Sequence, residues 1–173
     1  MINKIKEGIW QIEFSLFGSC VYILKHKGKI IVIDTGARWN KKELLEKLKE
    51  LKMSPPQVDV VILTHNHFDH TGNVNIFKNA KIYGGKEDFK SEKIFDADDL
   101  KINGIEIIKT PGHSKGSVCI YLEKEKILFS GDTIFHHGMT GRTDLSGGSG
   151  KDMKNSLKKI EEINYKFLCP GHI

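Results

Sequence analysis

The chain has 173 residues, with 27 basic against 22 acidic residues and a net charge of +5. This length suits one core, so we expect a single domain over residues 1–173. No stretch approaches the roughly 18 apolar residues of a membrane span, and no signal-peptide core follows the first lysines. Three widely spaced cysteines are typical of free thiols in a reducing compartment, which predicts a cytoplasmic protein. Because nearly all the positive charge is lysine, nucleic acid is not the expected partner.

The first half of the chain is predicted to contain mostly strands. Short apolar runs predict them at 8–14, 20–24, 29–34 and 58–63. A hairpin turn at 25–28 joins the second and third. Leucines spaced three or four residues apart predict a helix over 41–51, with Asn40 as its N-cap.

The second half mixes strands with a helix. Strands are expected at 81–83, 105–109, 118–122, 127–129 and 166–169. A glycine-rich loop over 138–150 leads into a helix predicted over 151–163. This order of elements predicts an α/β or α+β fold.

The densest candidate site follows the strand expected at 58–63. Its sequence is Thr64-His65-Asn66-His67-Phe68-Asp69-His70. On extended backbone His65 and His67 point to the same side, because side chains alternate with period two. Asp69 and His70 come after a turn and can aim at a second point nearby. This spacing of histidine and aspartate is typical of a metal site.

Three further residues of the same ligand types also follow predicted strands. They are His113 in Thr110-Pro111-Gly112-His113-Ser114, Asp132 in Phe129-Ser130-Gly131-Asp132-Thr133 and His172 in Cys169-Pro170-Gly171-His172. With the first segment they make five histidines and two aspartates, enough for two divalent ions with positions left for water. A carboxylate such as Asp132 can bridge two ions about 3.5–4 Å apart.

Together these residues resemble the metallo-β-lactamase-fold hydrolases. The His-x-His-x-Asp-His string, the later histidine, the aspartate and the terminal Pro-Gly-His occur in the order of that family. The segment Ile33-Asp34-Thr35-Gly36 also resembles the family's second-strand turn. The resemblance covers essentially the whole chain, and it implies a four-layered αββα sandwich with the site along one edge of its two sheets.

The resemblance also implies a role for each ligand-type residue. One metal site would use His65, His67 and His113. The other would use Asp69, His70 and His172, with Asp132 shared between the two. Asp34 would orient the ligand loop, although it could instead simply start a turn.

The segment Gly141-Arg142-Thr143-Asp144 resembles a signature of glyoxalase II-like thioester hydrolases. This branch implies hydrolysis of a small thioester or ester by a hydroxide that bridges two divalent ions, with Zn²⁺ expected and iron or manganese as alternatives. Asp69 would be the catalytic carboxylate that orients the nucleophile. Arg142 would bind substrate, or it would pair locally with Asp144.

Other activities remain open at this stage. His65, His113 and Asp132 also match the single-iron ligand set of persulfide dioxygenases. RNA-processing nucleases share the ligands, and a non-catalytic scaffold is the remaining alternative. The expected partner is a small molecule, with no membrane involved, and the sequence leaves the oligomeric state open.

Overall fold

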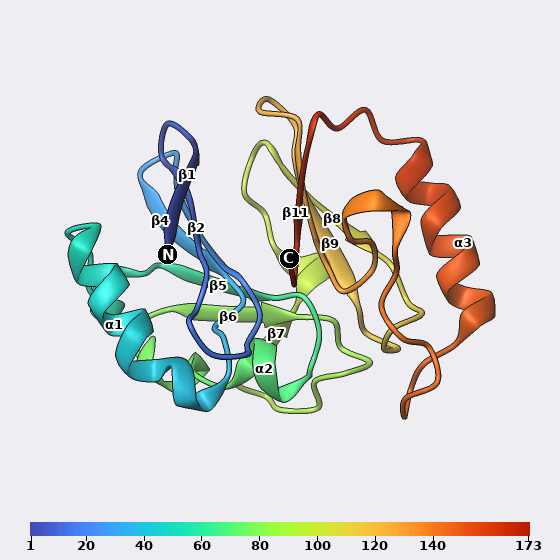
Figure 1. Cartoon of the computed structure of the whole chain (residues 1–173), viewed down its shortest axis with the longest axis horizontal. Coiled ribbons are helices and arrows are strands. Elements are labelled where there is room, and N and C mark those ends of the chain that lie inside the picture. Colours follow the sequence, from blue (N-terminus) through green and yellow to red (C-terminus); the bar gives the residue numbers. More distant parts are fainter. The chain divides into compact units, whose positions relative to one another are not determined.

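The computed structural model describes all residues, 1–173, and they form two compact units. Unit 1 comprises Met1–Leu63 and His67–Tyr83, and unit 2 comprises Thr64–Asn66 and Gly84–Ile173. Each unit combines strands with helices (Figure 1). None of the helices has the length and apolar content needed to cross a membrane.

Unit 1 is built on strands that neighbour one another in chain order. They are β1 (Ile2–Lys6), β2 (Ile9–Ile12), β3 (Val21–His26), β4 (Lys29–Ile33), β5 (Val60–Leu63) and β6 (Lys81–Gly84). The first four pair antiparallel, whereas β4 and β5 are parallel. A parallel pair needs a crossover connection, which α1 (Lys41–Glu50) supplies. All four residues of β5 are buried, as their uninterrupted apolar sequence predicts.

The helices of unit 1 follow from local sequence. In α1 the fully buried side chains are Leu44 and Leu48, one turn apart on a single face of an otherwise charged helix. A single-turn helix, α2 (Phe68–Thr71), carries Asp69 and His70. The α2 helix therefore turns the second half of the histidine-rich segment away from the line of β5.

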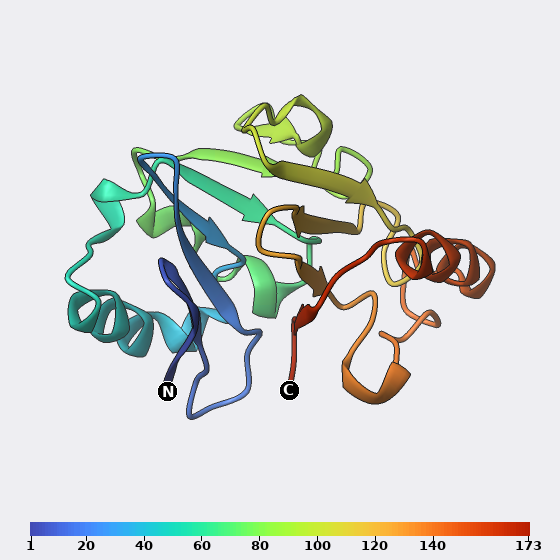
Figure 2. The same cartoon turned by 90° about the horizontal axis from the view of Figure 1, so that it is seen from above.

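Unit 2 contains a sheet in the order β11-β10-β9-β8. The helices and strands of unit 2 are β7 (Ile94–Asp96), β8 (Ile105–Lys109), β9 (Val118–Leu122), β10 (Ile127–Gly131), α3 (Gly150–Glu161) and β11 (Phe167–Pro170). Only the β10–β11 pair is parallel; β8–β9 and β9–β10 are antiparallel. Helix α3 begins at a side-chain cap from Ser149, and its Ile160 packs in one core cluster with Cys119 and Leu128. Figure 2 shows α3, in red, beside the sheet of unit 2.

The predicted fold class is confirmed: the protein is a mixed α/β structure with two sheets. The strands predicted at 105–109 and 118–122 have the bounds of β8 and β9. Two strands, β1 and β7, and one α-helix, α2, were not predicted.

Asn40 is the N-cap residue of α1, as predicted. Asn40 precedes the helix, but its side chain makes no capping hydrogen bond. Its Oδ1 instead accepts from the backbone N–H of Ala37, because Asn40 ends a preceding helical turn and has helical backbone angles.

Candidate metal centre

Strand directions gather four ligand-type residues at one edge of the sheet in unit 2. Since β8, β10 and β11 run the same way, the residues that follow their carboxyl ends meet at that edge. These residues are His113, Asp132 and His172. His65 joins them because the N–H of Val118, at the start of the opposite-running β9, donates to the carbonyl of Thr64.

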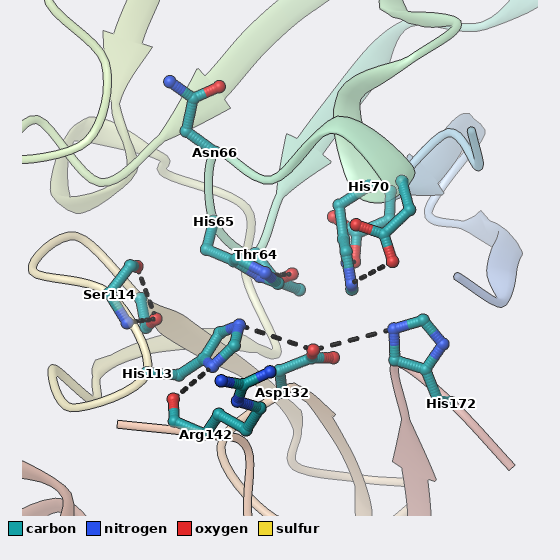
Figure 3. Close-up of polar contacts among 12 residues, drawn as sticks. Thr64, His65, Asn66, His70, His113, Ser114, Asp132, Arg142 and His172 are labelled. Carbon is teal, nitrogen blue, oxygen red and sulfur yellow. Dashed lines mark hydrogen bonds and ion pairs between the residues drawn. The ribbon is translucent and has the colours of Figure 1, made fainter. Parts of the chain in front are cut away.

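Asp132 lies at the centre of this group (Figure 3). Its Oδ2 atom is 3.4 Å from His113 Nε2 and 3.6 Å from His172 Nε2. The rings of His65 and His113 meet edge to face, with centroids 4.7 Å apart. The side chain of Asp132 is 10% exposed and that of His172 26%, so both retain some contact with solvent.

The tautomer of His113 follows from its other neighbour. His113 Nδ1 lies 2.7 Å from the carbonyl oxygen of Arg142, and a carbonyl can only accept a hydrogen bond. Nδ1 therefore carries a proton and donates a hydrogen bond to this carbonyl. When the ring is neutral, Nε2 has no proton and its lone pair faces Asp132. This is the arrangement of a histidine prepared to bind a metal through Nε2.

His65 is also held through Nδ1, which lies 3.0 Å from the hydroxyl of Thr64. Either atom of this pair can be the donor. The contact still engages Nδ1 and leaves Nε2 as the ring's remaining ligand atom. Both Thr64 and His65 are buried.

Unit 1 carries the second group of predicted ligands. His70 Nδ1 lies 2.8 Å from Asp34 Oδ2, and His70 Nε2 is 3.9 Å from Asp69 Oδ2. Asp34 follows β4 with φ of 58°, a left-handed conformation that aspartate adopts more readily than most residues. Because the carboxylate of Asp34 accepts a hydrogen bond from Nδ1, the other ring nitrogen of His70, Nε2, lies on the side of Asp69. His67 stands at the N-cap of α2 and is half-buried.

The distances in unit 2 suit a metal ion better than direct hydrogen bonds. A charge-assisted N–H···O bond to a carboxylate is about 2.7–2.9 Å long, shorter than both contacts of Asp132 Oδ2. Two ligand atoms about 2.05 Å from a tetrahedral ion are about 3.3 Å apart. Imidazole nitrogen and carboxylate oxygen are ligands that zinc and iron both accept. The residues present therefore fit a divalent metal ion.

The side chain of Arg142 pairs with a carboxylate that is not among the predicted ligands. Its guanidinium donates two hydrogen bonds to the carboxylate of Asp144, at 2.9 and 2.7 Å, and both side chains are exposed. This pairing lowers the pKa of Asp144 to about 2 and raises that of Arg142. The structure thus shows the local pair that the sequence left as an alternative.

Sequence reasoning missed two contacts of this site. The Thr64 hydroxyl and the Arg142 carbonyl both position histidines, but neither was singled out as a partner. Thr64 could have been suspected because it directly precedes His65 at the end of a buried strand. A backbone carbonyl offers no such signal, since every residue has one.

Comparison with known proteins identifies the family. The model of the Metallo-beta-lactamase superfamily matches residues 15–87 and 85–172. An atrochrysone carboxyl ACP thioesterase of Aspergillus fumigatus is 33% identical over 92% of this chain and 52% of its own length. A probable metallo-hydrolase of Methanocaldococcus jannaschii is 33% identical over 90% of this chain and 88% of its own. A hydroxyacylglutathione hydrolase of Aeromonas hydrophila is 32% identical over 83% and 56%. The chain thus spans only about half the length of the thioesterase and of the hydroxyacylglutathione hydrolase.

Solved structures show the same fold. A metallo-beta-lactamase from Pontibacter korlensis superposes with a TM-score of 0.82 at 22% identity, covering 100% of this chain and 91% of that one. A protein in a di-iron-bound form has a TM-score of 0.79 at 24% identity, covering 94% and 91%. ETHE1 from Myxococcus xanthus has a TM-score of 0.76 at 22% identity, covering 94% and 74%. The chain belongs to the metallo-beta-lactamase superfamily.

Proposed function

We propose that this protein is a metal-dependent hydrolase of a small thioester or ester, similar to glyoxalase II. One observation carries the proposal. His113 Nε2 and His172 Nε2 lie 3.4 and 3.6 Å from one oxygen of Asp132. The Nδ1–H of His113 donates a hydrogen bond to the carbonyl of Arg142. Imidazole nitrogens directed at a shared carboxylate at these distances support a divalent-ion site.

The ligand assignment follows the family motif. His65, His67 and His113 would hold one ion, and Asp69, His70 and His172 would hold the other. Asp132 would be shared, and Asp34 would orient His70. The contacts within each unit support these roles, because His65, His70 and His113 each have Nδ1 engaged with an oxygen. Two Zn²⁺ ions are the proposed cofactor, with iron or manganese as substitutes.

Asp69 and Arg142 would have the remaining roles in catalysis and substrate binding. Two divalent ions, when bound, supply a Lewis acid for the substrate carbonyl and lower the pKa of water toward neutrality. The carboxylate of the buried residue Asp69 would orient the attacking water and accept its proton. The exposed guanidinium of Arg142 would attract an anionic thiol portion of the substrate, with Asp144 holding it in place.

The thioesterase and hydroxyacylglutathione hydrolase names among the relatives support a thioester substrate. We further propose that residues 1–173 form one domain that acts on a small molecule in the cytoplasm. The cysteines support this location, because Cys20, Cys119 and Cys169 are all buried free thiols.

Metal analysis joined to a substrate panel tests the proposal. We expect about two zinc ions per chain after purification and reconstitution, and turnover of S-acylglutathione or simpler thioesters. The panel should also contain lactones and a phosphodiester. A metal-loaded protein that cleaves none of the esters would overturn the proposal, and cleavage of the phosphodiester alone would indicate the nuclease branch.

A mononuclear iron dioxygenase acting on a persulfide is the second candidate. Its support is that His65, His113 and Asp132 lie together in one unit and form a two-histidine, one-carboxylate set. The fold shared with ETHE1 is compatible with it. Oxygen uptake by iron-loaded protein with glutathione persulfide would establish this activity, because a hydrolase consumes no oxygen.

A further inference from the structure

The carboxylate of Asp88 collects hydrogen bonds from two loops of unit 2. Its Oδ1 accepts from the N–H of Gly116 at 2.7 Å. Its Oδ2 accepts from the hydroxyl of Ser114 at 2.6 Å and from the N–H of Asn66 at 3.1 Å. The side-chain amide of Asn66 in turn donates to the carbonyl of Asp88 at 3.1 Å. One residue therefore joins segments that are far apart in the chain.

Each of these segments carries a proposed metal ligand. Asn66 directly follows His65, and Ser114 directly follows His113. The two rings that meet edge to face, with centroids 4.7 Å apart, are those of His65 and His113. Because Asp88 binds the residue next to each histidine, it limits how far the two ligand loops can separate.

Close backbone packing supports the same connection. Asp88 ends a turn in which its N–H donates to the carbonyl of Gly85 at 2.9 Å. A Cβ atom at Gly85 would lie 2.0 Å from the carbonyl oxygen of Gly116, and one at Gly116 would lie 2.8 Å from the Cβ of Asp88. Only glycine at both positions lets the Asp88 turn approach the His113 loop this closely.

The loop that follows His113 is held by hydrogen bonds of its own. The hydroxyls of Ser114 and Ser117 are 2.7 Å apart, and the N–H of Ser114 donates to Ser117 Oγ at 3.1 Å. Both serines are buried. A displacement of Asp88 would therefore be passed to His113 through a hydrogen-bonded loop rather than absorbed by it.

We propose that Asp88 is a positioning residue of the metal centre, which holds the loops of His65 and His113 at the separation that metal binding requires. Both its oxygens already accept hydrogen bonds from the protein, so it acts through the ligands rather than as a ligand. A carboxylate suits this task because it is an acceptor only. In Asp88→Asn an amide N–H₂ would face an N–H or O–H donor. This inference rests on the proposed metal-binding function.

Zinc affinity and the cobalt spectrum of the purified full chain test the proposal. We expect Asp88→Asn to raise the zinc dissociation constant about 10–100-fold in a chelator competition, the range for losing a partner that orients ligands. Ser114→Ala removes one of the three bonds to the Asp88 carboxylate, together with the bond between the Ser114 and Ser117 hydroxyls, and its expected loss is about three- to tenfold. In both variants the visible bands of bound Co²⁺ should shift, because they report ligand geometry.

Glu87→Gln is the matched control, because Glu87 is adjacent, half-exposed and only 3.8 Å from Lys109 in a weak ion pair. It should bind zinc like the wild type. Wild-type affinity and an unchanged cobalt spectrum in folded Asp88→Asn would overturn the inference, even if its melting temperature fell. If Asp88→Asn does not fold, wild-type values in Ser114→Ala overturn it instead. Failure of the wild type to bind either metal would overturn the proposed function itself.

Discussion

The two units hold a histidine by the same atom but with different acceptors. In unit 1, Nδ1 of His70 donates to the carboxylate of Asp34 at 2.8 Å. In unit 2, Nδ1 of His113 lies 2.7 Å from the backbone carbonyl of Arg142. A carboxylate makes a charge-assisted bond that is roughly twice as strong as a neutral one, and it raises the basicity of the ring. The carbonyl orients the ring without adding a charge.

This difference has a consequence for mutation. The acceptor of His70 can be removed or neutralised by changing one side chain. The acceptor of His113 cannot, because any residue at position 142 retains a carbonyl. The arrangement in unit 2 is therefore sensitive to backbone position, whereas that in unit 1 is sensitive to residue identity.

The largest expected effect is on the alkylation rate of two buried thiols, one in each unit. Burial raises the pKa of Cys20, in unit 1, to about 12 and that of Cys119, in unit 2, to about 11, from an ordinary value of 9.0. Because the thiolate is the nucleophile, alkylation of the folded protein by iodoacetamide at pH 8 should be at least about 100-fold slower than in urea. Mass spectrometry of the two peptides then reports the opening of each unit.

The sign of the accompanying pH effect follows from the same shifts. Folded protein keeps both thiol protons to a higher pH than the unfolded chain, so these groups lower the free energy of unfolding as pH rises above about 9. Replacing both cysteines with alanine should flatten this part of the profile. Rapid labelling of either thiol in folded protein would contradict the assigned burial.

The next largest expected effect is on zinc affinity when the charged acceptor in unit 1 is removed. Asp34→Ala should weaken zinc binding about 10–100-fold, because His70 loses the partner that orients it. Asp34→Asn retains an acceptor and tolerates the left-handed backbone, so it should lose less, about three- to tenfold. Isothermal titration with zinc measures both. Equal losses in the two variants would show that the negative charge, rather than the hydrogen bond, is what His70 requires.

The smallest expected effect is on zinc affinity when the carbonyl acceptor in unit 2 is displaced. A Cβ atom at Gly141 would lie 2.1 Å from the carbonyl oxygen of Asp132 and 2.9 Å from His113 Nδ1. Gly141→Ala should therefore displace the Arg142 carbonyl and weaken zinc binding about tenfold. The matched variant Arg142→Ala keeps the carbonyl, so its zinc affinity should stay within about twofold while KM for an anionic thioester rises.

Nitrogen-detected NMR of the histidine ring adds a direct measurement for this pair of variants. The Nδ1–H signal of His113 should be lost or shifted in Gly141→Ala and retained in Arg142→Ala. A retained signal in both, together with unchanged affinity, would mean that the Arg142 carbonyl does not orient His113.

Much of the fold was predictable because its strong signals are local. The apolar run before Thr64 and the runs at β8 and β9 identify their strands without any tertiary information. The edge strand β1 was missed because its pattern of burial is intermediate and its lysines are typical of a surface segment. Asn40 was correctly predicted as the N-cap of α1, but the partner of its side chain, the N–H of Ala37, was not predicted.

By itself, the sequence predicted a metal centre, since histidine and aspartate at these spacings leave few alternatives to one. It also placed each ligand type at the end of a strand, because strand and loop signals are local. Only the tertiary structure decided which nitrogen of each histidine is available. That choice depends on acceptors such as the Arg142 carbonyl and the Asp34 carboxylate, which lie 29 and 36 residues from their histidines. Hydrogen bonds between such distant segments leave no periodic pattern in the chain, so they become visible only after it folds.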